Sequence, residues 1–134
     1  MKILHAYITV LLLSSSTVAI LAQKADTNAP PVHINAAEAR QYVGTNAVVS
    51  GKVAEVHKSR SVVSINFEKP YPNSPFAAII FAANTNSFPD PDKFKDQTLE
   101  ITGIIKSYQG RAEIILTKTS QLAVIEKPAE KEKK

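Results

Sequence analysis

The stretches Val49-Ser50-Gly51-Lys52-Val53 and Ile101-Thr102-Gly103-Ile104-Ile105 decide the fold. Each is rich in residues that favour β-structure, and each carries one glycine near its middle. Because glycine weakens the interior of a strand, it tends to mark a sharp bend, a bulge or a close approach of two backbones. Two such strands, with other strands between and after them, predict a small and strongly curved barrel.

Hydrophobic alternation extends this pattern to five expected strands, at about residues 47–57, 61–67, 76–82, 98–108 and 111–117. The third of them is apolar on both faces, which is typical of a strand covered on both sides or of one whose outer face binds a ligand. Residues 68–75 contain three prolines and predict a stiff loop, because proline cannot lie within a central strand.

A short helix is expected before the first strand. Asn35 can cap it, Glu38 can complete a capping box, and Gly44 can end it in the left-handed conformation. Between the third and fourth strands, residues 84–96 break the β pattern and predict a turn or one helical turn. Gln109-Gly110 predicts a hairpin turn. Four phenylalanines of these segments are expected in the core: Phe67, Phe81, Phe88 and Phe94.

The order of these elements predicts an all-β fold, a five-stranded Greek-key barrel of the OB type. It has a short N-terminal helix and a short helical or irregular link between strands 3 and 4. An SH3-like or other small barrel is the main alternative. The glycines in the first and fourth strands favour the OB type, because those two strands curl around to meet each other in it.

The two ends of the chain are expected to lie outside the folded domain. Residues 1–22 have the basic start and apolar run of a secretory signal peptide, although an uncleaved membrane anchor is an alternative. We expect residues 23–33 to form a linker, residues 34–125 to form the OB-fold domain, and residues 126–134 to form a charged disordered tail. We therefore expect a periplasmic or secreted protein with no stable membrane span after cleavage of the signal.

Composition excludes some classes of site and partner. The chain has no cysteine, which excludes a lipoprotein anchor, disulfides and thiolate metal sites. The formal net charge is +4, but residues 34–122 hold ten Lys or Arg and eight Asp or Glu, a net charge of +2. Strong nucleic-acid-binding domains usually carry a clearer basic surface, so charge alone argues only weakly for a polyanionic partner.

Several segments together resemble a family of small bacterial OB-fold domains of the nucleic-acid-binding, tRNA-anticodon-binding-like type, several of them exported. The resemblance covers about residues 34–122. It rests on Ile34-Asn35-Ala36-Ala37-Glu38-Ala39, on Val43-Gly44, on the two glycine-bearing strands, on Lys69-Pro70-Tyr71-Pro72-Asn73, and on Tyr108-Gln109-Gly110-Arg111 before Glu113-Ile114. It implies an OB fold and the binding of single-stranded nucleic acid. The chain departs from the family pattern at Phe81-Ala82-Ala83-Asn84, where relatives often carry a tryptophan or a basic residue.

OB folds bind ligands mainly on the face of the second and third strands, between the loops that join strands 1–2 and 4–5. Polar and aromatic side chains expected at that face are the candidate ligand-binding residues: Lys52, His57, Lys58, Arg60, Ser64, Asn66, Tyr71, Lys106, Tyr108 and Arg111. An ordinary polar rim is the simpler interpretation of the same residues.

Two roles follow for these residues if the ligand is a nucleic acid. Lys58, Arg60 and Arg111 would contact phosphates, and Tyr108 would stack on a base. Tyr71 has two interpretations: a stacking ring displayed by the loop, or a ring that packs between prolines and closes one end of the barrel. The structural role is the favoured one for Tyr71.

Catalysis has little support in the sequence. His57 stands alone, and no spacing brings a nucleophile, a base and an orienting acid together. Asp90, Asp92 and Asp96 lack the glycine and the closing glutamate of a calcium loop. We therefore expect a non-enzymatic binding domain without metal or cofactor. Its expected ligand is single-stranded DNA or RNA, and the alternative is an envelope protein or glycan.

Overall fold

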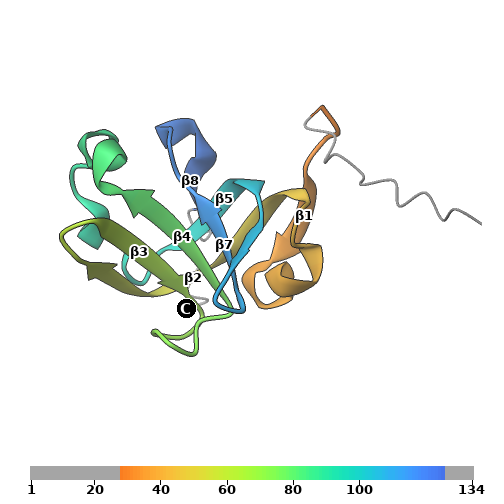
Figure 1. The fold of residues 1–134 in the computed structure, drawn as a ribbon, viewed down its shortest axis with the longest axis horizontal. Coiled ribbons are helices and arrows are strands. Elements are labelled where there is room, and N and C mark those ends of the chain that lie inside the picture. The colour runs from red at the N-terminus through yellow and green to blue at the C-terminus, as the bar shows by residue number, and fades with distance from the viewer. Residues whose placement is uncertain (1–27, 126–134) are drawn as a thin grey trace, which may run out of the picture.

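The computed structural model describes residues 28–125, which form mostly β-structure with short 3-10 helices (Figure 1). The strands are β1 (Val32–Asn35), β2 (Asn46–Lys58), β3 (Val62–Phe67), β4 (Phe76–Phe81), β5 (Thr98–Ile104), β6 (Lys106–Tyr108), β7 (Arg111–Ile115) and β8 (Leu122–Ile125). The helices are η1 (Ala36–Tyr42), η2 (Ala82–Ser87), η3 (Pro91–Phe94) and η4 (Thr119–Gln121).

The predicted signal peptide at residues 1–22, part of the predicted linker and the predicted tail at residues 126–134 lie outside the described residues. Within residues 28–125, no helix is long and apolar enough to cross a membrane.

Strand pairing follows the order β6-β7-β4-β3-β2-β5-β8, and β1 pairs in parallel with β2. The β2–β3, β3–β4, β2–β5 and β6–β7 pairs are antiparallel, whereas β4 and β7 are parallel. The five predicted strands correspond to β2, β3, β4, the β5–β6 segment and β7. In this order β7, β4 and β3 are adjacent strands of one sheet.

The long strand β2 changes partner along its length. Its first half, from Asn46 to Lys52, pairs with β5, and its second half pairs with β3 after a shift of register between Val53 and Glu55. Gly51 lies just before this shift. A Cβ atom at Gly51 would lie 2.8 Å from Ala36 Cβ and 3.1 Å from Phe67 Cδ1. Glycine is therefore needed here because the start of η1 and the end of β3 approach the backbone closely.

The short helix η1 forms as the sequence predicts, although its geometry is 3-10. The Asn35 N–H donates a hydrogen bond to Glu38 Oε2 at 3.1 Å, one half of the predicted capping box. Ala36 and Ala39 are fully buried. Gly44 has a φ of +89°, and its N–H donates to the Ile105 carbonyl at 2.7 Å. This hydrogen bond joins the end of the helix to the β5–β6 segment.

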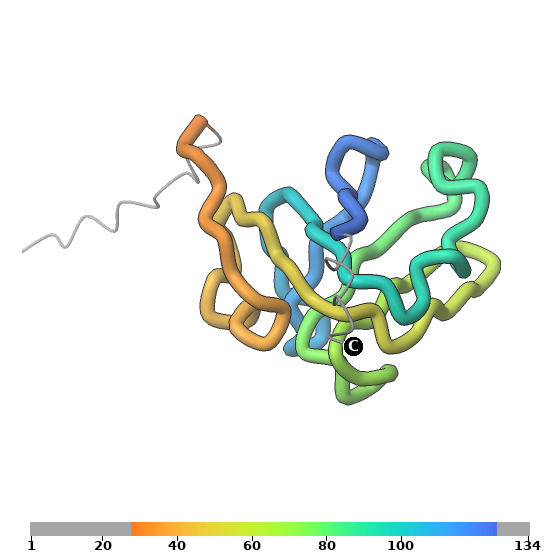
Figure 2. Tube along the Cα trace, turned by 180° about the vertical axis from the view of Figure 1, so that it is seen from behind, coloured from red at the N-terminus to blue at the C-terminus, as the bar shows by residue number. Residues whose placement is uncertain are grey.

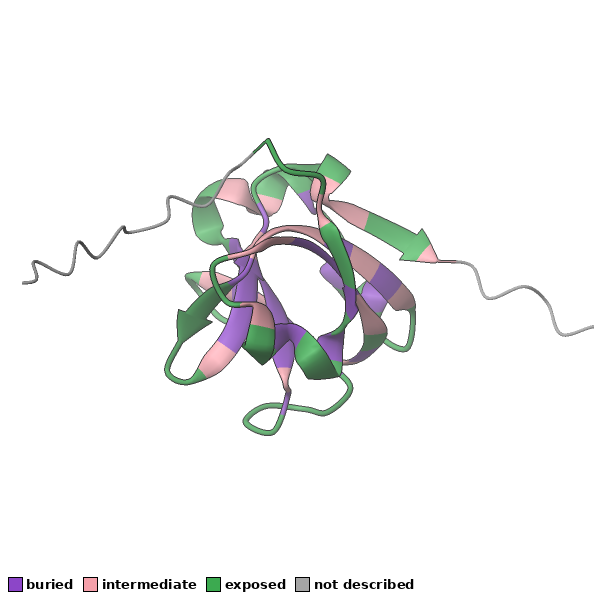
Figure 3. Ribbon diagram, turned by 90° about the vertical axis from the view of Figure 1, so that its right-hand side faces the viewer, coloured by how far each residue is buried: buried purple, intermediate pink, exposed green. Residues whose placement is uncertain are grey.

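Buried side chains gather on the inner side of the curved strands (Figure 3). The rings of Phe67 and Phe76 pack there with centroids 5.1 Å apart. Phe88 and Phe94 are also buried in this core, as predicted. The prediction for Phe81 is wrong, since its side chain is 43% exposed. Phe76, Ala78 and Ile80 of β4 face the core, so the alternation of the strand sends Phe81 outward.

The edges of the domain differ from the prediction at three places. Val32 and His33, assigned to the linker, belong to β1 and pair with Ala47 and Val48, and β1 runs beside β2 in Figure 2. The strand β8 was not predicted and pairs with β5. The predicted fourth strand is interrupted at Ile105, whose N–H donates to the Thr45 carbonyl.

Candidate ligand-binding groove

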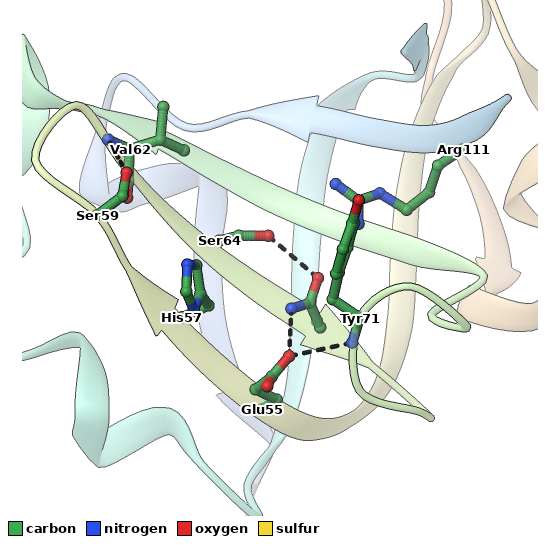
Figure 4. A pocket seen from close by; sticks show the side chains of 8 residues that line it. Glu55, His57, Ser59, Val62, Ser64, Tyr71 and Arg111 are labelled. Atoms are coloured by element: carbon green, nitrogen blue, oxygen red, sulfur yellow. Dashed lines mark hydrogen bonds between the residues drawn. The ribbon is translucent and has the colours of Figure 1, made fainter. Parts of the chain in front are cut away.

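Two neighbouring hollows lie on the outer face of the sheet, the first over β2 and β3 and the second over β3, β4 and β7. The first has a volume of about 380 Å³ and is lined by Glu55, His57, Ser59, Val62, Ser64, Asn66, Tyr71 and Arg111 (Figure 4). The second has a volume of about 240 Å³ and is lined by Val62, Ser64, Ile79, Phe81, Tyr108, Arg111 and Glu113. Because the two share Val62, Ser64 and Arg111, we treat them together as one outer groove.

Three exposed aromatic rings line the outer groove. Tyr71 is 62% exposed, Tyr108 is 57% exposed, and Phe81 belongs to the same set. They come from the β3–β4 loop, the end of β6 and the end of β4. The other exposed large apolar side chains of residues 28–125 are valines. The exposed aromatic surface of the described domain is therefore concentrated in this groove.

Tyr71 is displayed by its loop, so the favoured prediction that it closes one end of the fold is wrong. The Arg111 guanidinium lies over the Tyr71 ring, with its central carbon 5.3 Å from the ring centroid. Stacking of this kind orients an arginine and keeps its N–H groups available. The Nε and Nη1 atoms of Arg111 are buried and have no hydrogen-bond partner among the described residues. An acceptor oxygen of a ligand would satisfy them, since unpaired buried donors are costly.

A chain of hydrogen bonds organises the floor of the groove at its Tyr71 end. The Ser64 hydroxyl donates to Asn66 Oδ1 at 3.0 Å, and Asn66 Nδ2 donates to Glu55 Oε2 at 2.8 Å. The backbone N–H of Tyr71 also donates to Glu55 Oε2, at 3.0 Å. These bonds hold the β3–β4 loop against β2 and β3 (Figure 4).

The charge of Glu55 is set by this arrangement. The hydrogen bond from the Tyr71 backbone N–H is the largest cause that lowers the pKa of Glu55, and the Asn66 amide acts in the same direction. A lowered pKa leaves the carboxylate ionised at neutral pH. The Tyr71 end of the groove therefore carries a fixed negative charge beside an aromatic ring.

A second carboxyl group, Glu113, lies at the other end of the groove and is 7% exposed. Burial raises its pKa, while the positive charges of Arg111 and Lys106 act in the opposite direction. Lys106 stands opposite Glu113 in the β6–β7 pair. This end of the groove thus combines two basic side chains with one carboxyl group whose ionised form is disfavoured by burial.

The structure brings together most of the predicted site residues and separates the others. His57, Ser64, Asn66, Tyr71, Tyr108 and Arg111 line the outer groove. Lys106 adjoins it through β7. Lys58 instead forms an ion pair with Asp92 and borders a different hollow. Lys52 and Arg60 are exposed and line neither part of the groove.

Sequence reasoning missed several groove residues: Glu55, Ser59, Val62, Ile79, Phe81 and Glu113. For Ile79 and Phe81 a signal existed, because a strand with two apolar faces is also typical of an outer binding surface. Among residues 28–125, no group of three or more His, Cys, Asp or Glu side chains is placed so that it could hold a metal ion.

The chain is similar to the OBody AM1L10 bound to hen egg-white lysozyme, with a TM-score of 0.54, 18% sequence identity, and coverage of 74% of this chain and 98% of that chain. It is also similar to a structure assigned as an aspartyl-tRNA synthetase from Leishmania major Friedlin, with a TM-score of 0.49 and 11% identity. That match covers 74% of this chain and 21% of the other.

No protein-family model and no curated protein matches the chain. The similarity to the OBody shows a fold of the OB type, with mostly β-structure and a few short helices.

Proposed function

We propose that the chain is an exported, non-enzymatic domain, a five-stranded OB-type barrel, that binds single-stranded DNA or RNA in the outer groove. The observation that carries this proposal is the concentration of the exposed rings Tyr71, Phe81 and Tyr108 around Arg111. Single strands bind where aromatic rings offer stacking platforms for bases and nearby cations pair with phosphates.

The position of the groove supports the same ligand. It lies on β3 and β4, the second and third strands of the OB order, and the β6–β7 turn flanks it. OB folds bind oligonucleotides and oligosaccharides at this place. In the proposed complex the three rings stack on bases, whereas Arg111 and Lys106 contact phosphates. Lys58 is not assigned to the ligand because Asp92 already neutralises it.

Fluorescence anisotropy of labelled single-stranded DNA and RNA, measured against the purified protein at low and moderate salt, tests this function. We expect binding in the micromolar range or tighter that weakens as salt rises, because phosphate contacts release counterions. Tyr108→Ala should weaken binding by about 1–3 kcal/mol, the usual value of one base stacked on an aromatic ring. Val124→Ala, an exposed apolar side chain outside the groove, is the control. No binding at low salt would refute the proposal.

A glycan or an envelope protein is the second candidate ligand, and the carboxyl groups of Glu55 and Glu113 in the groove favour it. Carboxylates accept hydrogen bonds from sugar hydroxyls or backbone amides, and they repel phosphates. Binding of cell-wall oligosaccharides, unchanged between low and moderate salt, would support this candidate. Salt-sensitive binding of nucleic acid with no retention of oligosaccharide would exclude it.

A further inference from the structure

We propose that the outer groove selects guanine, through recognition of the guanine Watson–Crick edge by the Glu55 carboxylate while the base stacks on Tyr71. This inference rests on the proposed binding of single strands and adds a base preference to it.

The Glu55 carboxylate is fixed in orientation with one oxygen left for a ligand. Both of its hydrogen-bond donors within the described residues, the Tyr71 N–H and the Asn66 amide, bind Oε2. Oε1 receives no hydrogen bond from residues 28–125. Because Glu55 lines the first hollow, a base in that hollow meets an ionised acceptor whose position is already set.

The neighbouring floor of the groove also offers acceptors. The Ser64 hydroxyl gives its proton to Asn66, so Ser64 Oγ presents lone pairs to the groove. A ligand edge that faces Glu55 and Ser64 must therefore carry donors. An edge that carried acceptors there would meet the negative charge of Glu55 without compensation.

Guanine is the nucleobase that fits this requirement best. Its Watson–Crick edge places two adjacent donors, N1–H and the N2 amino group, side by side, and the two lone pairs of the free Glu55 Oε1 can accept both. Adenine and cytosine present one amino donor beside a ring-nitrogen acceptor. Uracil and thymine present one imino donor between two carbonyl acceptors. These other edges would turn at least one acceptor toward Glu55, which costs part of the binding free energy.

The backbone of the residue that carries the ring is tied to the carboxylate, because the Tyr71 N–H donates to Glu55 Oε2. Figure 4 shows the Tyr71 ring edge-on, with His57 and Ser64 on one side of it and Glu55 below. A base stacked on the ring over this hollow would bring its edge toward Glu55. The negative charge keeps phosphates away from that end, so the backbone of the strand would run on the side of Arg111 and Lys106.

The experiment uses oligothymidylates of one length that differ only at a central position, which holds dT, dG, dA, dC or deoxyinosine. Anisotropy with the unaltered protein should show the dG oligonucleotide binding about tenfold more tightly than dT, by analogy with bidentate readout of a base edge. Deoxyinosine lacks the N2 amino group and keeps N1–H, so its affinity should fall between those of dG and dT. This comparison needs no protein variant and so is independent of folding.

The variant Glu55→Gln then tests whether Glu55 recognises the guanine edge. The substitution keeps the shape of the side chain and replaces one acceptor oxygen with a donor amide. We expect the ratio of dG to dT affinity to fall to about one, a loss of the whole tenfold preference. Glu100→Gln, on β5 and outside the groove, makes the same charge change and should keep the ratio.

The outcomes separate the two proposals. Absence of binding to every oligonucleotide refutes the proposed function and this inference together. Equal binding of all five central bases overturns the guanine preference and leaves the function standing. Glu55→Gln that strengthens every oligonucleotide equally and keeps the dG preference shows that Glu55 acts by charge alone, which overturns the inference.

Discussion

The variant Gly51→Ala tests the packing that shapes the fold around the groove. A Cβ atom at Gly51 would lie 2.7 Å from Glu68 Oε1, 2.8 Å from Ala36 Cβ and 3.1 Å from Phe67 Cδ1. The Glu68 side chain is exposed and can move, at the cost of the hydrogen bond that it accepts from the Lys52 N–H at 3.2 Å. Ala36 and Phe67 are fully buried and cannot withdraw as easily.

The change in the free energy of unfolding caused by Gly51→Ala is the difference between a cost of overpacking and a gain in backbone entropy. Overpacking a core by one methyl group costs about 1–3 kcal/mol. Replacing glycine by alanine in an extended backbone gains about 0.4–1 kcal/mol, through a less flexible unfolded chain. We therefore expect Gly51→Ala to lower the free energy of unfolding by about 1–2 kcal/mol, which lowers the Tm of a domain of this size by roughly 5–15 °C.

Urea unfolding followed by circular dichroism measures the change, and a double-mutant cycle assigns it. Ala36→Gly removes the atom nearest to the new methyl group that cannot move, so in the double variant the two substitutions should offset each other by about 1 kcal/mol. Gly110→Ala is the control, because a Cβ at that position meets nothing within 4 Å, although the positive φ of 75° adds its own strain. A Gly51→Ala protein as stable as the parent, or a cycle with no coupling, would refute the close-approach argument.

Two further predictions concern single polar side chains. Burial raises the pKa of Glu113 above its ordinary value of 4.5, so the folded state loses stability as the pH rises through the native pKa. Glu113→Gln should therefore raise the free energy of unfolding at pH 7 and leave it nearly unchanged at pH 4. An equal increase in the free energy of unfolding at both pH values, or the same increase in Glu100→Gln, would contradict this. Gln121 joins η4 to β5 and β7 through four hydrogen-bonding partners, Thr117, Lys118, Thr102 and Ile115. Gln121→Ala should lower the free energy of unfolding, measured with urea, by about 1–3 kcal/mol. Gln41 is exposed, so Gln41→Ala should change that free energy little.

Much of the strand framework could be predicted because it depends on local alternation and on glycines at close contacts. Gly51 and Gly103 both mark a close approach, since a Cβ at Gly103 would lie 2.8 Å from Ile114 Cγ2. The strands β1 and β8 were not predicted because each has only four residues, too few to show a clear alternation. Such short segments become strands through hydrogen bonds to β2 and β5, and those partners are distant in sequence.

The composition of the groove was harder to predict, for a reason that differs between residues. On β4 every residue from Phe76 to Phe81 is apolar, so alternation gives no indication of which face is inner. On β2 the register shift between Val53 and Glu55 changes which positions face outward, and Gly51 indicates an irregularity without giving the position of the shift. Phe81 was therefore assigned to the core and Glu55 to no site, although both line the groove.

The basic residues show why a loop position in sequence does not establish a role in binding. The sequence predicts Lys58 and Arg60 as phosphate contacts because they share the hairpin between β2 and β3. In the structure Asp92, 34 positions along the chain, pairs with Lys58, so that charge is already compensated. The Arg111 guanidinium lies over the Tyr71 ring, and its Nε and Nη1 atoms have no hydrogen-bond partner among the described residues. Affinity for an anionic strand should thus depend on Arg111 far more than on the net charge of the domain.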